Sequence, residues 1–221
     1  MKEITFDQIK SCEEINMYIE KGDSVLGVMG FTEHSRAHGM KVAVTAGIIL
    51  KQLGYSQHTI KIAEITGYMH DIGNCVNRND HAHSGAILAF QILKSLEMNP
   101  QDIATIVAAI GNHDEKTGTA VDAVSAAVIL ADKTDVRRNR VRNQVKSSFD
   151  IHDRVNYAAV SSKLNINLEN KTIHLEIKLD DKMCSVMDYF EIFLQRMLMC
   201  KRAAEILDLK FKLTANGSKV C

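Results

Sequence analysis

The stretch Gly67-Tyr-Met-His-Asp-Ile-Gly-Asn74 places His70 and Asp71 side by side at the end of an apolar helical segment. An imidazole and a carboxylate on consecutive residues can bind one divalent cation, and the second carboxylate oxygen can reach a neighbouring cation. Further histidines and an aspartate flank this pair along the chain: His38, His81, His113 and Asp132. The pair therefore predicts half of a metal site whose other ligands come from distant segments.

Apolar residues recur at helical spacing in six segments before residue 146. The first expected helix spans 6–20, with Gly22 as its stop, and the second is capped by Thr32 and ends at Gly54. The third runs from Ser56 through His70 to about Gly73, and the fourth follows the loop 74–80. The fifth starts at Asn99-Pro100, and the sixth spans 121–135. With a single proline in the chain, this pattern predicts a mainly α fold, a helical bundle over residues 1–149.

The pattern changes after about Phe149. Residues 163–168 and 172–179 alternate between apolar and polar, as half-buried strands do, and a short turn joins them. A helix over 185–207 and a last strand over 209–213 follow. We therefore predict a small β-β-α-β appendage, residues 150–221, packed on the bundle without a flexible linker.

Helical spacing directs the polar residues of the site inward. His70 follows Ile60, Ala63 and Gly67 by ten, seven and three residues, so it belongs to the buried face of its helix. Four other segments direct an imidazole or a carboxylate inward in the same way. Any one of them fits a core histidine or a helix-end charge, but burying all of them without partners is costly, and a cation relieves that cost.

Two more histidines leave alternatives open. His34 precedes His38 by one helical turn and could be a metal ligand, a substrate contact or a support for a ligand. His83 competes with His81 as a ligand, but His83 shares a helix face with the charged Lys94. We therefore prefer His81.

The order of His38, His70-Asp71 and Asp132 resembles the H…HD…D pattern of the HD-domain metal-dependent phosphohydrolases. The surrounding residues 38–43, 68–73 and 129–133 resemble the three motifs of that family, and His81 and His113 resemble the extra histidines of its dinuclear members. The resemblance covers residues 32–142. Asn74 stands where the branch that hydrolyses cyclic-di-GMP usually has lysine, which argues against that substrate.

The resemblance implies a cofactor of one or two divalent cations per chain. The first would be held by His38, His70, Asp71 and Asp132, and the second by His81 and His113, with Asp71 bridging the two and His70-Asp71 at the catalytic centre. Nitrogen and oxygen ligands suit iron, manganese, nickel or cobalt, and they also accept zinc.

A basic stretch follows the last of these motifs. If the helix continued past Asp132, Lys133, Arg137 and Arg140 would share one face and could bind substrate phosphates, with His34 as a further substrate contact. A solvated basic face, or ion pairs with the appendage, is the alternative. Asp135 would then support a metal ligand or balance the arginines.

The resulting hypothesis is a phosphohydrolase that uses metal-activated water to cleave a phosphate ester of a nucleotide or a related small metabolite. An HD-type di-iron oxygenase is the enzymatic alternative. A non-catalytic regulatory module that senses a nucleotide through the appendage is the alternative from another class.

The composition sets the remaining expectations. Lys+Arg and Asp+Glu each number 27, so net charge gives no strong attraction to nucleic acid or membrane. Five scattered cysteines without a Cys-x-x-Cys suit free thiols in a reducing compartment. Without a signal sequence or an apolar span, we expect a cytoplasmic protein that acts on a small molecule, as a monomer or a homodimer.

Overall fold

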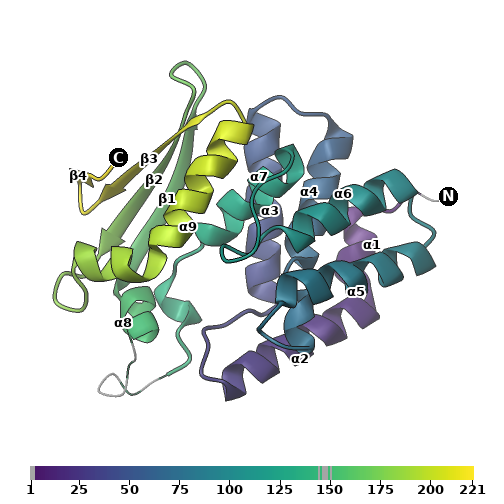
Figure 1. Cartoon of the computed structure of the whole chain (residues 1–221), viewed down its shortest axis with the longest axis horizontal. Coiled ribbons are helices and arrows are strands. Elements are labelled where there is room, and N and C mark those ends of the chain that lie inside the picture. The colour runs from purple at the N-terminus through teal and green to yellow at the C-terminus, as the bar shows by residue number, and fades with distance from the viewer. Residues whose placement is uncertain (1–2, 144, 146–148, 150) are drawn as a thin grey trace.

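The computed structural model describes residues 3–143, 145, 149 and 151–221, with only the backbone described at 151 and 152. The first part of the chain is a bundle of helices (Figure 1). It contains α1 (Phe6–Ser11), α2 (Glu13–Val28), α3 (Arg36–Gln52), α4 (Gln57–Met69), α5 (His81–Ser95), α6 (Pro100–Gly111) and α7 (Ala123–Lys133), with the short 3-10 helices η1 (Ile72–Cys75) and η2 (Arg138–Arg140).

The second part contains α8 (Ile151–Ala158), β1 (Ala159–Asn167), β2 (Thr172–Leu179), α9 (Val186–Ile206), β3 (Lys210–Ala215) and β4 (Ser218–Lys219). The mainly α fold with a small C-terminal β-β-α-β unit is therefore confirmed, and α8 and β4 add to it. The boundary predicted at 149/150 involves residue 150, which lies outside the described residues, so the division into two units stays a prediction.

Local capping chemistry explains several helix starts. The Ser56 side chain accepts a hydrogen bond from the backbone N–H of Thr59, and Asn99 caps α6 with Pro100 in its first turn, as predicted. The cap predicted at Thr32 is wrong, because α3 begins at Arg36 and Ser35 accepts from the N–H of Ala37. The loop before α3 is thus three residues longer than predicted, and it reaches over the site described below.

The first predicted helix, 6–20, is wrong in two respects: it is broken at Cys12, and its second part extends beyond Gly22. An extended residue at Cys12 divides it into α1 and α2, and α2 continues through Gly22 to Val28. A Cβ atom on Gly22 would lie 3.0 Å from the backbone nitrogen of Cys75 in η1. Gly22 therefore allows α2 to approach η1 closely and does not end the helix.

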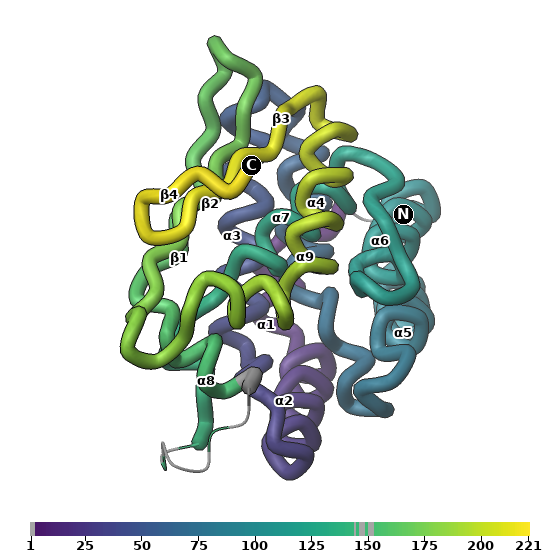
Figure 2. The backbone as a smooth tube through the Cα atoms, turned by 60° about the vertical axis from the view of Figure 1, so that its left-hand side comes forward, coloured from purple at the N-terminus to yellow at the C-terminus, as the bar shows by residue number. Residues whose placement is uncertain are grey.

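The sheet has the order β1-β2-β3-β4, with β1 antiparallel to β2, and β3 antiparallel to β4. The central pair β2 and β3 is parallel, with Ile173 opposite Phe211. Parallel strands need a crossover connection, and α9 provides it. This helix packs on both β3 and α7, so it joins the sheet to the bundle, as Figure 2 shows from a second side. Phe193 of α9 is thereby buried, and the partly buried Arg196 lines the cavity described below together with it.

One hydrophobic core runs through both parts of the chain. It includes Ile65 of α4, Ile129 of α7, Phe193 of α9 and Leu175 of β2. Within the described residues, no helix combines the length and the apolar character needed to cross a bilayer.

The close approach of α4 to α3 at Gly67 predicts a stability effect. A Cβ atom on Gly67 of α4 would lie 2.9 Å from both the Cα and the N atom of Ala43 in α3, a contact that backbone atoms cannot relieve without moving the helix. Gly67→Ala should therefore lower the free energy of unfolding by about 1–3 kcal/mol. Urea denaturation measures this change. Gly111→Ala is the matched control, because its Cβ atom would make an ordinary 3.7 Å contact with Ala86, and equal losses in both variants would contradict the packing argument.

Candidate metal centre

The six residues predicted as metal ligands come together from five segments of the bundle. His70 and Asp71 follow the end of α4, and the other four lie at helix ends: His38 in the first turn of α3, His81 at the start of α5, His113 just after α6, and Asp132 near the end of α7. Their ligand atoms form three groups, each within 4.8 Å: His38, His70 and Asp71; His70, His113 and Asp132; and Asp71, His81 and His113. Convergence of helix ends explains how residues 94 positions apart can share one site.

Asp71 lies between two sets of histidines. Its Oδ2 atom is 3.2 Å from Nε2 of His70 and 3.7 Å from Nε2 of His38. Its Oδ1 atom is 3.5 Å from Nε2 of His81 and 3.7 Å from Nε2 of His113. Each oxygen therefore faces a different pair of imidazoles, an arrangement suited to a carboxylate that bridges two cations.

Asp132 completes the first set. Its Oδ1 atom lies 3.3 Å from Nε2 of His38 and 3.7 Å from Nε2 of His70. Its other oxygen, Oδ2, lies 2.8 Å from Nζ of Lys133. One oxygen thus faces the site and the other is held by a cation of the protein.

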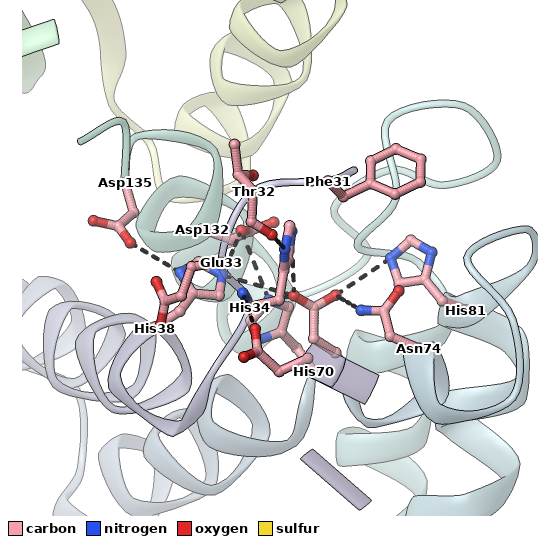
Figure 3. A network of polar contacts seen from close by, with 12 residues as sticks. Phe31, Thr32, Glu33, His34, His38, His70, Asn74, His81, Asp132 and Asp135 are labelled. Atoms are coloured by element: carbon pink, nitrogen blue, oxygen red, sulfur yellow. Dashed lines mark hydrogen bonds and ion pairs between the residues drawn. The ribbon is translucent and has the colours of Figure 1, made fainter. Parts of the chain in front are cut away.

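Hydrogen bonds on the far side of each ring fix the orientation of the histidines. The Nδ1 atoms of His70, His81 and His113 donate to the carbonyl oxygens of Gly67 (2.8 Å), Arg78 (3.0 Å) and Ile110 (2.6 Å). A carbonyl oxygen only accepts, so the Nδ1 atom of each ring carries a proton and the Nε2 atom faces the site. His38 is held in the same way, since its Nδ1 donates to Oδ2 of Asp135 at 2.8 Å (Figure 3).

Buried atoms without partners show that the residues fit a divalent cation. The His38 and His70 side chains are 1% and 0% exposed, and their Nε2 atoms have no hydrogen-bond partner among the described residues. Leaving such atoms unsatisfied costs free energy. A cation bound between them and the two carboxylates would remove this cost, and imidazole nitrogens with carboxylate oxygens are the donors that transition metals prefer.

The electrostatics of the site agree with this fit. Burial opposes ionisation of Asp71 and Asp132, yet His70 beside the first and Lys133 beside the second hold the pKa of each carboxyl well below its usual range. Burial lowers the pKa of His81 to about 4 in spite of the neighbouring Asp71, so this imidazole is neutral near pH 7. Burial opposes protonation of His70, but Asp71 and Asp132 raise its pKa to about 10, so a cation bound at its Nε2 atom would displace a proton. The site thus presents ionised carboxylates and a neutral His81, and metal binding would release a proton from His70.

His34 and His83, whose roles the sequence left open, differ in their distance from the metal site. His34 Nε2 lies 4.0 Å from Oδ2 of Asp71, and its Nδ1 donates to the carbonyl oxygen of Thr32 at 2.7 Å. It lies at the edge of the site, where a substrate contact stays the prediction. His83 is 56% exposed, and its Nδ1 lies 3.3 Å from Oδ1 of Asp80, outside the three groups. The structure therefore brings His81, and not His83, to Asp71.

The prediction of a basic helix face after Asp132 is wrong. Helix α7 ends at Lys133, where the Thr134 hydroxyl donates to the carbonyl oxygen of Leu130. The chain then turns back, and Arg140 donates from Nη1 to the carbonyl oxygen of Asp135 at 2.8 Å. Lys133 and Arg140 still line the cavity of the site, whereas Arg137 holds Asp135 through an Nε–Oδ1 contact of 2.6 Å and is not among the lining residues.

Asp135 therefore supports a ligand, one of the two roles considered for it. Asp135→Asn replaces a carboxylate acceptor by a weaker amide and should reduce the affinity for the first cation about ten- to a hundredfold. Competition with a metal chelator measures that affinity. Asp102→Asn is the matched control, because Asp102 accepts from the surface residue His58 at 2.8 Å, and a similar loss in both variants would contradict the assigned role.

A cavity of about 530 Å³ opens onto the site. Its wall includes residues without a signal in the sequence pattern: Phe31, Arg78, Glu115, Phe193 and Arg196. Glu115, in the loop between α6 and α7, forms ion pairs with Lys133 at 2.8 Å and with Arg196 at 3.1 Å, and so connects α7 to α9. The C-terminal unit thereby forms part of the cavity wall.

Comparison with known proteins agrees with the geometry. The HD domain family model matches residues 36–154, which is 119 of the 221 residues, and the chain belongs to the HD-domain family. The family resemblance of the sequence motifs is thereby confirmed. The cluster of histidines and aspartates is the divalent metal site that this family membership indicates.

Two kinds of relatives are similar to this chain. An uncharacterised protein of Methanocaldococcus jannaschii is 25% identical over 201 residues, 80% of this chain and 76% of that protein. Ribonuclease Y of Campylobacter concisus is 31% identical over 119 residues, 54% of this chain, and that of Thermosipho melanesiensis is 27% identical over 118 residues, 52% of this chain. These matches span only 21% and 22% of the two ribonucleases, so the similarity concerns one part of those proteins.

Proposed function

We propose that this protein is a metal-dependent phosphohydrolase that cleaves a phosphate ester of a nucleotide or a related small metabolite, with water as the nucleophile. The observation that carries the proposal is the position of Asp71, whose two oxygens each face a pair of buried imidazole nitrogens. Membership of the HD-domain family and the similarity of one segment to ribonuclease Y, a hydrolase of phosphate esters by its name, support it.

The roles of the residues follow from the geometry. His38, His70, Asp71 and Asp132 would hold the first cation, and His81 and His113 would hold a second one with Asp71. When bound, such cations acidify a water molecule and neutralise the oxygens of a phosphate group. Asp135 orients His38, and Lys133 orients Asp132.

The cavity suits a small phosphate ester. Its volume of about 530 Å³ lies in the usual range for small-molecule sites. Five cationic side chains line it: Arg78, Lys116, Lys133, Arg140 and Arg196. Six carboxylates line it as well: Asp71, Asp80, Asp114, Glu115, Asp132 and Asp153. Divalent cations bound at Asp71 and Asp132 would offset this negative charge and allow the cavity to accept an anionic substrate. Lys133 and Arg140 are already engaged by acidic or carbonyl oxygens, so we assign them first to the balance of charge around Asp132 and Asp135.

A reconstitution experiment tests the proposal. Protein stripped with a chelator is loaded with Mn²⁺, Fe²⁺, Co²⁺ or Zn²⁺ and incubated with a panel of phosphate monoesters and diesters, including nucleotides, while released phosphate, new phosphomonoester and dissolved oxygen are followed. We expect hydrolysis that depends on the cation and consumes no oxygen. Substrate-dependent oxygen uptake by the iron-loaded protein without hydrolysis would instead assign the oxygenase alternative. Nucleotide binding without turnover, retained after metal removal, would assign the sensing module.

A further inference from the structure

Arg78 differs from the other arginines of the cavity in how its guanidinium is held. Its Nη1 atom has three partners at long distances: Oδ1 of Asn74 at 3.3 Å, Nε2 of His81 at 3.4 Å and Oδ1 of Asp71 at 3.8 Å. By comparison, Arg140 donates to the carbonyl oxygens of Glu33 and Asp135 at 2.9 and 2.8 Å. The Arg78 head group is therefore the more weakly held of the two.

Two of the three Arg78 partners are atoms that the proposed cations would use. Nε2 of His81 and Oδ1 of Asp71 both face the second half of the metal site. Nε2 of His81 has a single lone pair, so it could not accept from Arg78 once it held a cation, and a cation on Asp71 would weaken the 3.8 Å ion pair with Arg78. Metal binding would leave the guanidinium with Asn74 as its main partner and with free donors. A guanidinium in that state pairs best with a planar or tetrahedral oxyanion such as phosphate.

An aromatic ring lies beside this guanidinium at the mouth of the cavity. The Cζ atom of Arg78 is 5.8 Å from the centroid of the Phe31 ring, and Phe31 is 40% exposed although it lines the cavity. Figure 3 shows Phe31 on the His81 side of the site, opposite His38 and Asp135. An exposed ring next to an arginine is a surface on which a nucleobase stacks, because every base presents a flat π face.

We propose that Arg78 binds the substrate phosphate beside His81, and that Phe31 stacks on the base of the same substrate. The substrate class is then a nucleotide rather than a sugar phosphate. This inference rests on the proposed function and narrows it. Arg78 is a substrate-binding residue in this account and not a metal ligand.

Calorimetric titration of Mn²⁺-loaded protein with two probes that cannot be hydrolysed tests the inference. Inorganic phosphate reports on the phosphate contact, and adenosine 5′-methylenephosphonate reports on phosphate and base together. Arg78→Gln should weaken both probes by about ten- to a hundredfold. Phe31→Ala should weaken the nucleoside phosphonate about fivefold or more and leave phosphate unchanged.

Two matched variants control for the loss of an exposed arginine and an exposed ring. Arg202→Gln removes an exposed arginine of α9 that does not line the cavity. Phe90→Ala removes a ring that is 41% exposed and lies under a cation, with Nζ of Lys94 at 5.4 Å from its centroid. Both controls should bind the two probes as the unaltered protein does, and metal analysis should find the same cation content in all four variants.

The outcomes separate the inference from the function on which it rests. Unchanged phosphate binding in Arg78→Gln, loss of cations from that variant, or equal effects of Phe31→Ala on both probes would overturn the inference alone. If the unaltered protein bound neither probe, or bound both equally well after metal removal, the proposed function itself would fail. Metal-dependent binding that Arg78→Gln weakens for both probes and Phe31→Ala weakens for one supports the inference.

Discussion

Asp71→Asn should lose stoichiometric divalent metal and lower the rate of phosphate-ester hydrolysis by about 10³-fold or more. The amide keeps the shape of the side chain, but it carries no negative charge and offers only one good acceptor oxygen. Because the two Asp71 oxygens face four imidazoles, this single change removes the anionic ligand from both halves of the site. Elemental analysis and a phosphate-release assay measure the two effects.

The same variant should keep its fold. Helices α3, α4 and α7 are held together by an apolar core that the substitution does not touch. A circular dichroism spectrum like that of the unaltered protein, together with full metal content in Asp102→Asn, would show that the loss is local. Full metal content in Asp71→Asn would contradict the site.

His81→Ala and His113→Ala should lower the metal content from two cations toward one per chain. Both imidazoles face Oδ1 of Asp71, and neither is among the four residues proposed to hold the first cation. Hydrolysis should fall by about a hundredfold or more, because one of the two cations that neutralise the phosphate is lost. The measurement is elemental analysis after dialysis against a fixed concentration of Mn²⁺, followed by the phosphate-release assay.

His83→Ala provides the internal comparison, since His83 lies two residues from His81 on the same helix but points to solvent. It should keep two cations and full activity. Two cations in both His81→Ala and His113→Ala, or a larger loss in His83→Ala than in His81→Ala, would overturn the assignment of the second half of the site.

The convergence of the candidate ligands could be predicted in part because several of them lie where local rules apply. His70 continues the buried face of α4, and Asn99-Pro100 and Ser56 cap their helices through contacts within three residues. The break at Cys12 and the passage of α2 through Gly22 could not be predicted in this way. The passage through Gly22 depends on the approach of α2 to η1, which lies some fifty residues further along the chain, and the break at Cys12 has no signal in the apolar pattern.

The residues of the cavity wall were harder to predict than the ligands, because contacts between distant parts of the sequence bring them together. Arg196 lies on α9, and only the packing of α9 on α7 brings it to Glu115. The predicted basic helix face failed because α7 ends at Lys133 and Arg140 donates back to the carbonyl oxygens of Asp135 and Glu33, and helical periodicity contains no information about such a turn. The sequence left two roles open for Asp135, and the structure shows that this turn brings its carboxylate within hydrogen-bond distance of His38 Nδ1.

Titration of chelator-stripped protein with Mn²⁺, followed by electron paramagnetic resonance, distinguishes a bridged pair of cations from isolated ones. We expect two ions to bind per chain and the fully loaded protein to give the spectrum of an exchange-coupled pair, because the Asp71 carboxylate would bridge the two ions. Two uncoupled ions, or no stoichiometric binding at all, would contradict a bridged metal centre built on Asp71.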